Sequence, residues 1–176
     1  MRVQSPQPIF FAYAGASADG TRTRYSPQGI FTYKWFSALA EYVHTEVPIA
    51  STTARAEIAH RAWQVAGSVV LTGESATDGS TGVRPRANFD VGHGHWGALQ
   101  LAARYHQLEV DEAARRLGFA AAGSSLEAES WTLGVNWFAT PNLRYLFDVE
   151  RTVFDGNTAG SRPAENTLLF RSQIAF

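Results

Sequence analysis

The side chains in this sequence that could do chemistry are mainly basic residues that recur on one parity of alternating segments. Successive side chains of a β-strand point to opposite faces, so residues of one parity line one face of a sheet. Guanidinium groups bind carboxylates and phosphates in a bidentate manner, so such a face is suited to anions. The candidate residues for an anion path are Arg22, Arg24, Lys34, Arg104, Arg144 and Arg171. A solvated sheet face would show the same pattern, and Asp148 and Glu150 lie near enough to pair with the later arginines.

Other kinds of chemistry lack the residues that they need. His93 and His95 could offer two imidazoles to a metal ion, but no third histidine or carboxylate pair nearby completes a site. Ser124 and Ser125 lack a nucleophile-elbow pattern, and no glycine-rich phosphate loop follows a strand. The carboxylates show no spacing that would fix an acid/base pair. We therefore expect no enzyme activity, no metal site and no cofactor.

Length and composition limit the class of protein. The chain has 176 residues, enough for one domain, and its net charge of -1 gives no global field that would attract nucleic acid. It contains no cysteine, which excludes disulfides and thiolate metal sites. No apolar run approaches the roughly 18 residues of a membrane helix, and residues 1–6 do not resemble a signal peptide. We expect one domain over residues 1–176, with residues 1–20 as a poorly defined lead-in, and a chain that is a piece of a longer protein.

The elements that must position the basic residues are strands of alternating polarity. Residues 131–137 place Trp, Leu, Val and Trp on one parity, and residues 168–176 alternate in the same way up to Phe176. Similar segments precede them, although residues 36–46 could also form a helix. The whole pattern predicts seven or eight strands joined in sequence, which is an antiparallel up-and-down meander. Residues 77–95 and 155–163 are expected to be loops.

Alternation alone does not distinguish two kinds of β-sheet protein. A soluble barrel would bury the apolar face, and it could bind a small apolar ligand. A barrel in an outer membrane places charge inside, apolar side chains in lipid and aromatic residues at both rims. Trp131 and Trp137, at the two ends of one apolar face, are typical of such rims. Phe176 ends the last apolar face, as is usual for the closing strand of an outer-membrane barrel.

Several segments, taken in order, resemble the phosphate-selective porins O and P of Gram-negative outer membranes. They are Ser26-Pro27-Gln28-Gly29, Leu39-Ala40-Glu41-Tyr42-Val43, Ala62-Trp63-Gln64-Val65-Ala66, Leu71-Thr72-Gly73-Glu74, Trp96-Gly97-Ala98-Leu99, Leu101-Ala102-Ala103-Arg104-Tyr105, Thr132-Leu133-Gly134-Val135-Asn136-Trp137 and Phe170-Arg171-Ser172-Gln173-Ile174-Ala175-Phe176. The resemblance covers about residues 20–176 and the C-terminal half of that family's barrel. It implies an all-β transmembrane antiparallel barrel, with about seven or eight of 16 strands present. It also implies a location in the cell outer membrane, contact with its lipid, and a homotrimer when the protein is full-length.

The resemblance further implies passive diffusion of small anions, with inorganic phosphate or polyphosphate as candidates, through an arginine-lined lumen. Arg22 and Arg24 have the parity of the family's arginine ladder, and Phe176 would be the barrel-assembly signal. The family's phosphate site uses clustered lysines, whereas Lys34 is the only lysine here. Eight strands close a barrel that side chains fill, whereas 16 leave an aqueous channel. Two alternatives therefore stay open: a non-conducting truncated or filled barrel, and a soluble barrel that binds a small ligand.

Overall fold

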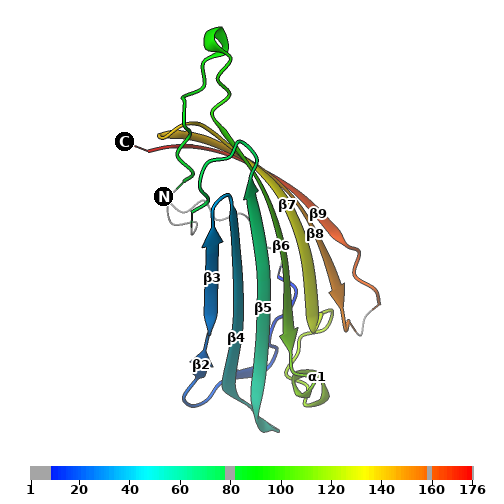
Figure 1. Cartoon of the computed structure of the whole chain (residues 1–176). Coiled ribbons are helices and arrows are strands. Elements are labelled where there is room, and N and C mark those ends of the chain that lie inside the picture. The colour runs from blue at the N-terminus through cyan, green and yellow to red at the C-terminus, as the bar shows by residue number, and fades with distance from the viewer. Residues whose placement is uncertain (1–8, 78–81, 158–159, 176) are drawn as a thin grey trace.

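The computed structural model describes residues 9–77, 82–157 and 160–175, and its regular secondary structure is almost entirely β-strand (Figure 1). The strands are β1 (Ala16–Ala18), β2 (Thr23–Tyr25), β3 (Gln28–Tyr33), β4 (Phe36–Ser51), β5 (Arg55–Val70), β6 (Ala98–Val110), β7 (Glu127–Thr140), β8 (Leu143–Asp155) and β9 (Glu165–Ile174). Two helical turns lie in loops, a 3-10 helix (Val91–His93) and α1 (Ala113–Arg116). In the described residues, no helix has the length and apolar character needed to cross a membrane.

All strands belong to one antiparallel sheet whose order follows the chain. β4 pairs with β5, β5 with β6, and the series continues through β7 and β8 to β9. On its other side, β4 pairs in turn with β1, β2 and β3, so these three short strands share one position in the sheet. The sheet therefore has seven positions, in agreement with the predicted meander. Residues 36–46, for which a helix was the alternative, lie in β4.

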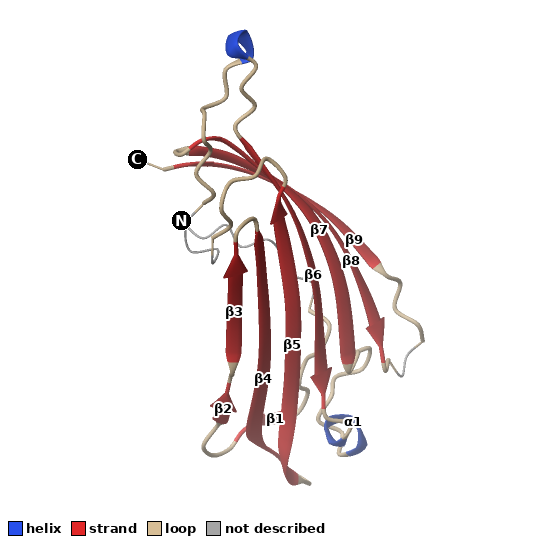
Figure 2. Cartoon of the chain, in the orientation of Figure 1, coloured by secondary structure: helices blue, strands red, loops and turns tan. Residues whose placement is uncertain are grey.

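The sheet is curved into an open trough, as Figures 1 and 2 show. Within the described residues, β9 pairs with β8 alone, and it does not meet β1, β2 or β3 across the opening. Every neighbouring pair is antiparallel, and six steps separate β3 from β9, so the two edge strands run in the same direction. An antiparallel barrel could therefore be closed only by an odd number of further strands.

The convex outer face of the trough is apolar over the middle of the strands. Its side chains are largely exposed, with Leu133 of β7 67% exposed. The residues of this apolar band are Phe31, Val65, Leu101, Leu133, Val135, Phe147, Val149, Leu168 and Phe170. An exposed apolar band of this size is not a feature of water-facing surfaces, and it fits contact with lipid.

Two rows of aromatic side chains border the apolar band. One row crosses the strands at Tyr42, Trp63, Tyr105 and Trp131, with ring centroids 5.0 Å apart for Trp63 and Tyr105 and 4.4 Å apart for Tyr105 and Trp131. The other row contains Phe36, Trp137 and Tyr145, and the last two rings stack at 5.4 Å. Trp131 and Trp137 are six residues apart on β7, or about 20 Å along a strand. This arrangement matches the aromatic girdles at the two interfaces of an outer-membrane barrel.

The concave inner face is filled with apolar side chains near the end of the trough that carries α1. Residues 9–14 cross this face and join the loop of residues 111–126 through an isolated bridge between Tyr13 and Ala120. Phe119, which is fully buried, is central to the cluster. The buried members are Ile49, Ile58, Val110, Ala114, Phe119 and Leu126. Part of the segment predicted to be a poorly defined lead-in is therefore packed inside the trough.

The long connection between β5 and β6 closes over part of the inner face at the opposite end. Val83 is buried there against Phe138 of β7. Glu74 is buried as well, and it accepts hydrogen bonds from the Thr72 hydroxyl and from the backbone N–H of Arg86, the latter at 3.3 Å. Burial by itself raises the pKa of Glu74, but these donors and the Arg86 guanidinium outweigh it, and the pKa lies below its usual range. The ionised carboxylate thus ties the base of the loop together.

Candidate functional site

The centre of the inner face is an ion pair that spans three strands. Nη2 of Arg104 on β6 lies 3.1 Å from Oε2 of Glu150 on β8. Thr132, on β7 between them, donates its hydroxyl to the same Glu150 oxygen at 2.8 Å. The register places Arg104 opposite Thr132, and Thr132 opposite Glu150. Both charged side chains remain partly exposed, so the pair holds the guanidinium in place without hiding it from a solute.

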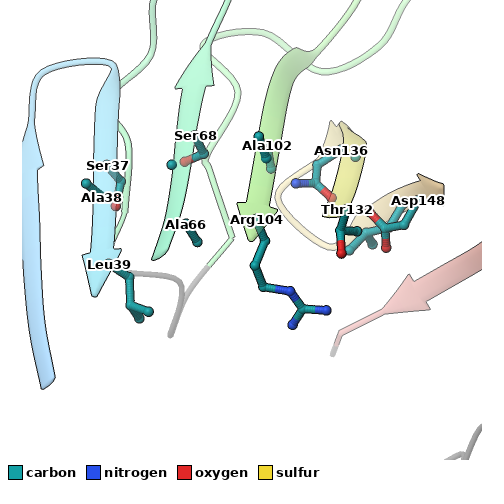
Figure 3. Close-up of a pocket in the computed structure, with 14 residues that line it drawn as sticks. Ser37, Ala38, Leu39, Ala66, Ser68, Ala102, Arg104, Thr132, Asn136 and Asp148 are labelled. Atoms are coloured by element: carbon teal, nitrogen blue, oxygen red, sulfur yellow. The ribbon is translucent and has the colours of Figure 1, made fainter. Parts of the chain in front are cut away.

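Asp148 is a second carboxylate on this face, and it lies over Gly134 of the neighbouring strand. A Cβ atom at position 134 would overlap the Asp148 carboxylate, so the glycine makes room for it. Asp148 interacts electrostatically with Arg104 on one side and with Arg171 of β9 on the other. Figure 3 shows Arg104 and Asp148 on the same face of the sheet, with Thr132 between their strands. Basic and acidic groups therefore alternate across β6, β8 and β9.

Arg144 lies on β8 toward the end of the trough where short turns join β3 to β4 and β7 to β8, which we call the turn end. Its Nε and Nη2 both donate to Oε1 of Gln173 on β9, at 3.1 Å and 2.7 Å. These bonds orient the guanidinium without neutralising its charge, because the partner is an uncharged amide. Arg144 and Arg171 together line a hollow of about 360 Å³. Two of the predicted anion-path arginines thus meet in this hollow.

A row of uncharged polar side chains forms the other wall of the same hollow. Asn136 Nδ2 on β7 donates to Gln100 Oε1 on β6 at 3.0 Å. Gln100 Nε2 in turn donates to the Ser68 hydroxyl on β5, also at 3.0 Å. Within the described part of the chain, Asn136 Oδ1 is buried and has no hydrogen-bond donor. We call the three side chains, Asn136, Gln100 and Ser68, the amide row.

A second hollow, of about 330 Å³, extends from the first toward the middle of the trough and is lined by residues of β4 to β8. Arg104, Thr132 and Asp148 lie along it (Figure 3). The two hollows share Ser37, Ser68, Ala102, Asn136 and Leu146. The inner face therefore carries a continuous groove that leads from the central ion pair to the turn end.

The remaining predicted cations are at the edge formed by β2 and β3. Arg24 lies on β2 opposite Thr45 of β4, whose side chain is on the inner face, and Arg22 is close enough to His60 of β5 to interact electrostatically. Lys34 does not lie on the inner face. It occupies the two-residue turn between β3 and β4 with a φ of +51°, and its Nζ lies 5.2 Å from the ring centroid of Tyr33. The hairpin turn takes Lys34 out of the strand register from which its position was predicted.

Two further features compare the sequence predictions with the structure: the predicted assembly signal and the amide row. Phe176, the predicted assembly signal, lies outside the described residues. The amide row was not predicted as a functional feature, although each of its members falls on the polar parity of its strand. That parity was the available signal, but an uncharged side chain on a polar face gives no indication of what it binds.

His93 and His95, the candidate metal ligands, lie at the tip of the loop between β5 and β6. The nitrogen Nδ1 of His93 is 2.7 Å from Oδ2 of Asp90, and the two imidazole rings stack with centroids 6.2 Å apart. The hydrogen bond from His93 lowers the pKa of Asp90. Among the described residues, no group of three or more potential metal ligands comes together. The Asp90 side chain caps the 3-10 turn of the loop by accepting a hydrogen bond from the backbone N–H of His93.

The comparison with protein families agrees with this geometry. A search of curated protein sequences found no match to the chain. The model of the family described as phosphate-selective porin O and P matches residues 10–176, a range that includes every strand of the sheet. Members of that family are channels rather than enzymes. The match covers far more than half of the sequence, and the chain belongs to the phosphate-selective porin O and P family.

Proposed function

We propose that this chain forms part of the wall of an outer-membrane pore through which small anions diffuse passively. The observation that carries the proposal is the division of one curved sheet into two faces. The outer face has an exposed apolar band between two aromatic rows, and the inner face has a polar, charged groove. Lipid outside and water inside is the environment in which both faces are stable.

The inner face supports anions as the solutes. Five of the six cations singled out from the sequence lie on this face or beside it: Arg22, Arg24, Arg104, Arg144 and Arg171. Guanidinium groups stay ionised at all relevant pH values and offer several donors to a passing carboxylate, phosphate or chloride. Family membership supports phosphate as one of these anions.

The open edges support assembly with further strands. An exposed sheet edge has unpaired backbone donors and acceptors, which are costly in a bilayer. Nine further strands would complete a barrel of sixteen, and nine is an odd number, as the parallel direction of β3 and β9 requires. We propose that these strands complete the pore in the outer membrane of a Gram-negative bacterium, and that complete pores associate as homotrimers.

Ionic current across a planar lipid bilayer tests this function. The chain would be refolded in detergent and added under a potassium chloride gradient, and the reversal potential would report the preference for anions. We expect discrete current steps with anion preference, and a decrease of the chloride current when phosphate is added. A silent bilayer, with circular dichroism showing that the chain is folded and rich in β-structure, would mean that the chain forms no pore without the further strands, whereas current steps without a preference for anions would contradict the proposal.

A pair of matched variants tests whether a cation on the inner face, rather than the total charge of the chain, determines the anion preference. Arg144→Gln removes a cation from the groove, and Arg151→Gln removes one from the outer face of the same strand. Both variants lose one positive charge, so the net charge changes equally. We expect Arg144→Gln to lower the anion preference and Arg151→Gln to leave it unchanged. Equal effects of the two variants would mean that the groove is not the path of the ions.

A further inference from the structure

The two hollows on the inner face carry an excess of positive charge. The charged side chains that line them, in the described part of the chain, are Arg104, Arg144, Arg171 and Asp148. Guanidinium groups along a groove attract an anion, and they attract a divalent anion most strongly. A pore must also release its solute, because conduction requires binding that is weak enough for the ion to leave. Asp148 is the residue of this set that can weaken the binding.

Asp148 lies near two of the arginines without a direct ion pair to either. It interacts electrostatically with Arg104 of β6 and with Arg171 of β9. Among the described residues, the ion pair of Arg104 is with Glu150 instead, at 3.1 Å. An anion that reaches either guanidinium therefore also meets the negative charge of Asp148. Since this repulsion grows with the charge of the anion, it weakens the binding of a divalent anion more than that of a monovalent one.

Gly134 determines where the Asp148 carboxylate lies. The two residues are direct cross-strand partners on β7 and β8, and a Cβ atom at position 134 would overlap Oδ1 of Asp148. The carboxylate therefore lies over β7, close to the sheet, and Figure 3 shows the Asp148 side chain beside Thr132 of that strand. Gly134 does not have a positive φ, so its backbone conformation is open to any residue. The glycine provides the space that Asp148 occupies.

We propose that Asp148, held in the recess over Gly134, determines how readily the groove releases an anion, and that Gly134 is its positioning residue. From the recess the carboxylate weakens the hold of the arginines without standing in the path of the solute. For a charge at about 6 Å in water, Coulomb's law weakens the binding of a monovalent anion about three-fold and that of a divalent anion about ten-fold. The inference rests on the proposed function, because it concerns the passage of the same anions.

Chlorine-35 NMR on the full chain, refolded in detergent, tests the role of Asp148 without a current. Chloride that binds to the protein broadens the resonance, and inorganic phosphate, mainly divalent at about pH 8, narrows it by displacing chloride. We expect Asp148→Asn to bind chloride about three-fold and phosphate about ten-fold more tightly than the unchanged chain. Glu57→Gln, which removes a carboxylate from the outer face, is the control and should change neither affinity.

Gly134→Ala tests the positioning of the carboxylate. The added methyl group moves the Asp148 carboxylate out of its recess and into the groove, so we expect chloride and phosphate to bind at least three-fold more weakly. In Asp148→Ala no carboxylate remains to be moved, and the addition of Gly134→Ala should have no further effect. A purely structural role of the glycine would give the same change with and without Asp148.

Gly67→Ala is the control for the added methyl group. The Cβ of this residue would point to the outer face of β5 and meet its nearest neighbours at ordinary distances of 3.9 and 4.0 Å. We expect this variant to bind chloride and phosphate as the unchanged chain does. Circular dichroism verifies the fold of each variant, and Asp148→Asn alone decides the inference if Gly134→Ala does not fold.

The inference is overturned if Asp148→Asn leaves both affinities unchanged, or if it changes the two by the same factor. It is also overturned if Gly134→Ala acts equally with and without Asp148, or if neither the unchanged chain nor Asp148→Asn binds an anion. The proposed function fails in a different way. Current steps without a preference for anions, together with the expected affinities, would reject the anion pore and retain the role of Asp148. Anion-selective current with unchanged affinities would retain the pore and reject that role.

Discussion

Arg104 and Glu150 form an ion pair of 3.1 Å although they lie 46 positions apart and on strands that are not neighbours. The strand between them contributes Thr132, which donates to the same carboxylate. The pair therefore depends on the register of three strands, and it sets the charge at the middle of the groove. Both partners are partly exposed, so its effect on solutes is expected to exceed its effect on stability.

Removal of the Glu150 charge is expected to raise the anion preference of the pore. In Glu150→Gln the guanidinium of Arg104 loses its counter-charge, and one unit charge at about 6 Å in water contributes about 0.7 kcal/mol, or roughly a three-fold change in the permeability ratio. The reversal potential under a salt gradient measures this ratio. Glu57→Gln, which removes the same charge from the outer face, is the control and should not change it. An unchanged ratio in Glu150→Gln would mean that Arg104 does not contact the ions.

A charge in the apolar band is expected to destabilise the folded protein in lipid. Leu133→Arg places a guanidinium between the two aromatic rows of β7, where an outer-membrane barrel loses about 2–4 kcal/mol. Urea-dependent unfolding in lipid vesicles measures the loss. Glu129→Arg, on the same strand and face but beyond Trp131, is expected to cost less than about 1 kcal/mol. Similar losses for both variants would show that Trp131 does not mark the edge of the hydrocarbon layer.

Acidification is expected to loosen the connection between β5 and β6. Glu74 has a lowered pKa, so its ionised form stabilises the folded loop above the pKa of the unfolded chain, and this contribution is lost as the pH falls through the lower folded value. The protection of amides 72–77 and 82–86, measured as hydrogen exchange relative to the intrinsic rate at each pH, should therefore decrease below about pH 4. Glu74→Gln should exchange several-fold faster at neutral pH and lose the pH dependence, since one hydrogen bond contributes about 1 kcal/mol. Glu112→Gln, whose side chain makes no capping bond, is the control.

Truncation of Phe119 is expected to disrupt the cluster that residues 9–14 form inside the trough. The ring is fully buried, and removal of such a ring costs about 3–5 kcal/mol. Unfolding in urea should show this loss for Phe119→Ala. Val91→Ala, in the exposed loop tip, should cost less than about 0.5 kcal/mol. A small loss in Phe119→Ala would indicate that the cluster does not contribute to the stability of the folded chain.

The alternation of side chains was enough to predict the sheet and its two faces. Trp131 and Trp137 lie on the outer face, and Arg104, Arg144 and Arg171 lie on the inner one, as their parity indicated. Lys34 shows the limit of this reasoning. A period of two holds only within a strand, and the turn between β3 and β4 interrupts it at that residue.

The sequence by itself determined which residues form strands and which face each side chain takes, because both depend on local backbone geometry. The family resemblance of its ordered segments was also evident without the structure, and the family match confirms it. Only the tertiary structure decided which side chains meet across strands. The pairing of Arg104 with Glu150, the hydrogen bonds of the amide row and the burial of Phe119 against other segments all depend on register and curvature. Those properties arise from contacts between segments far apart in the chain, which a local pattern does not encode.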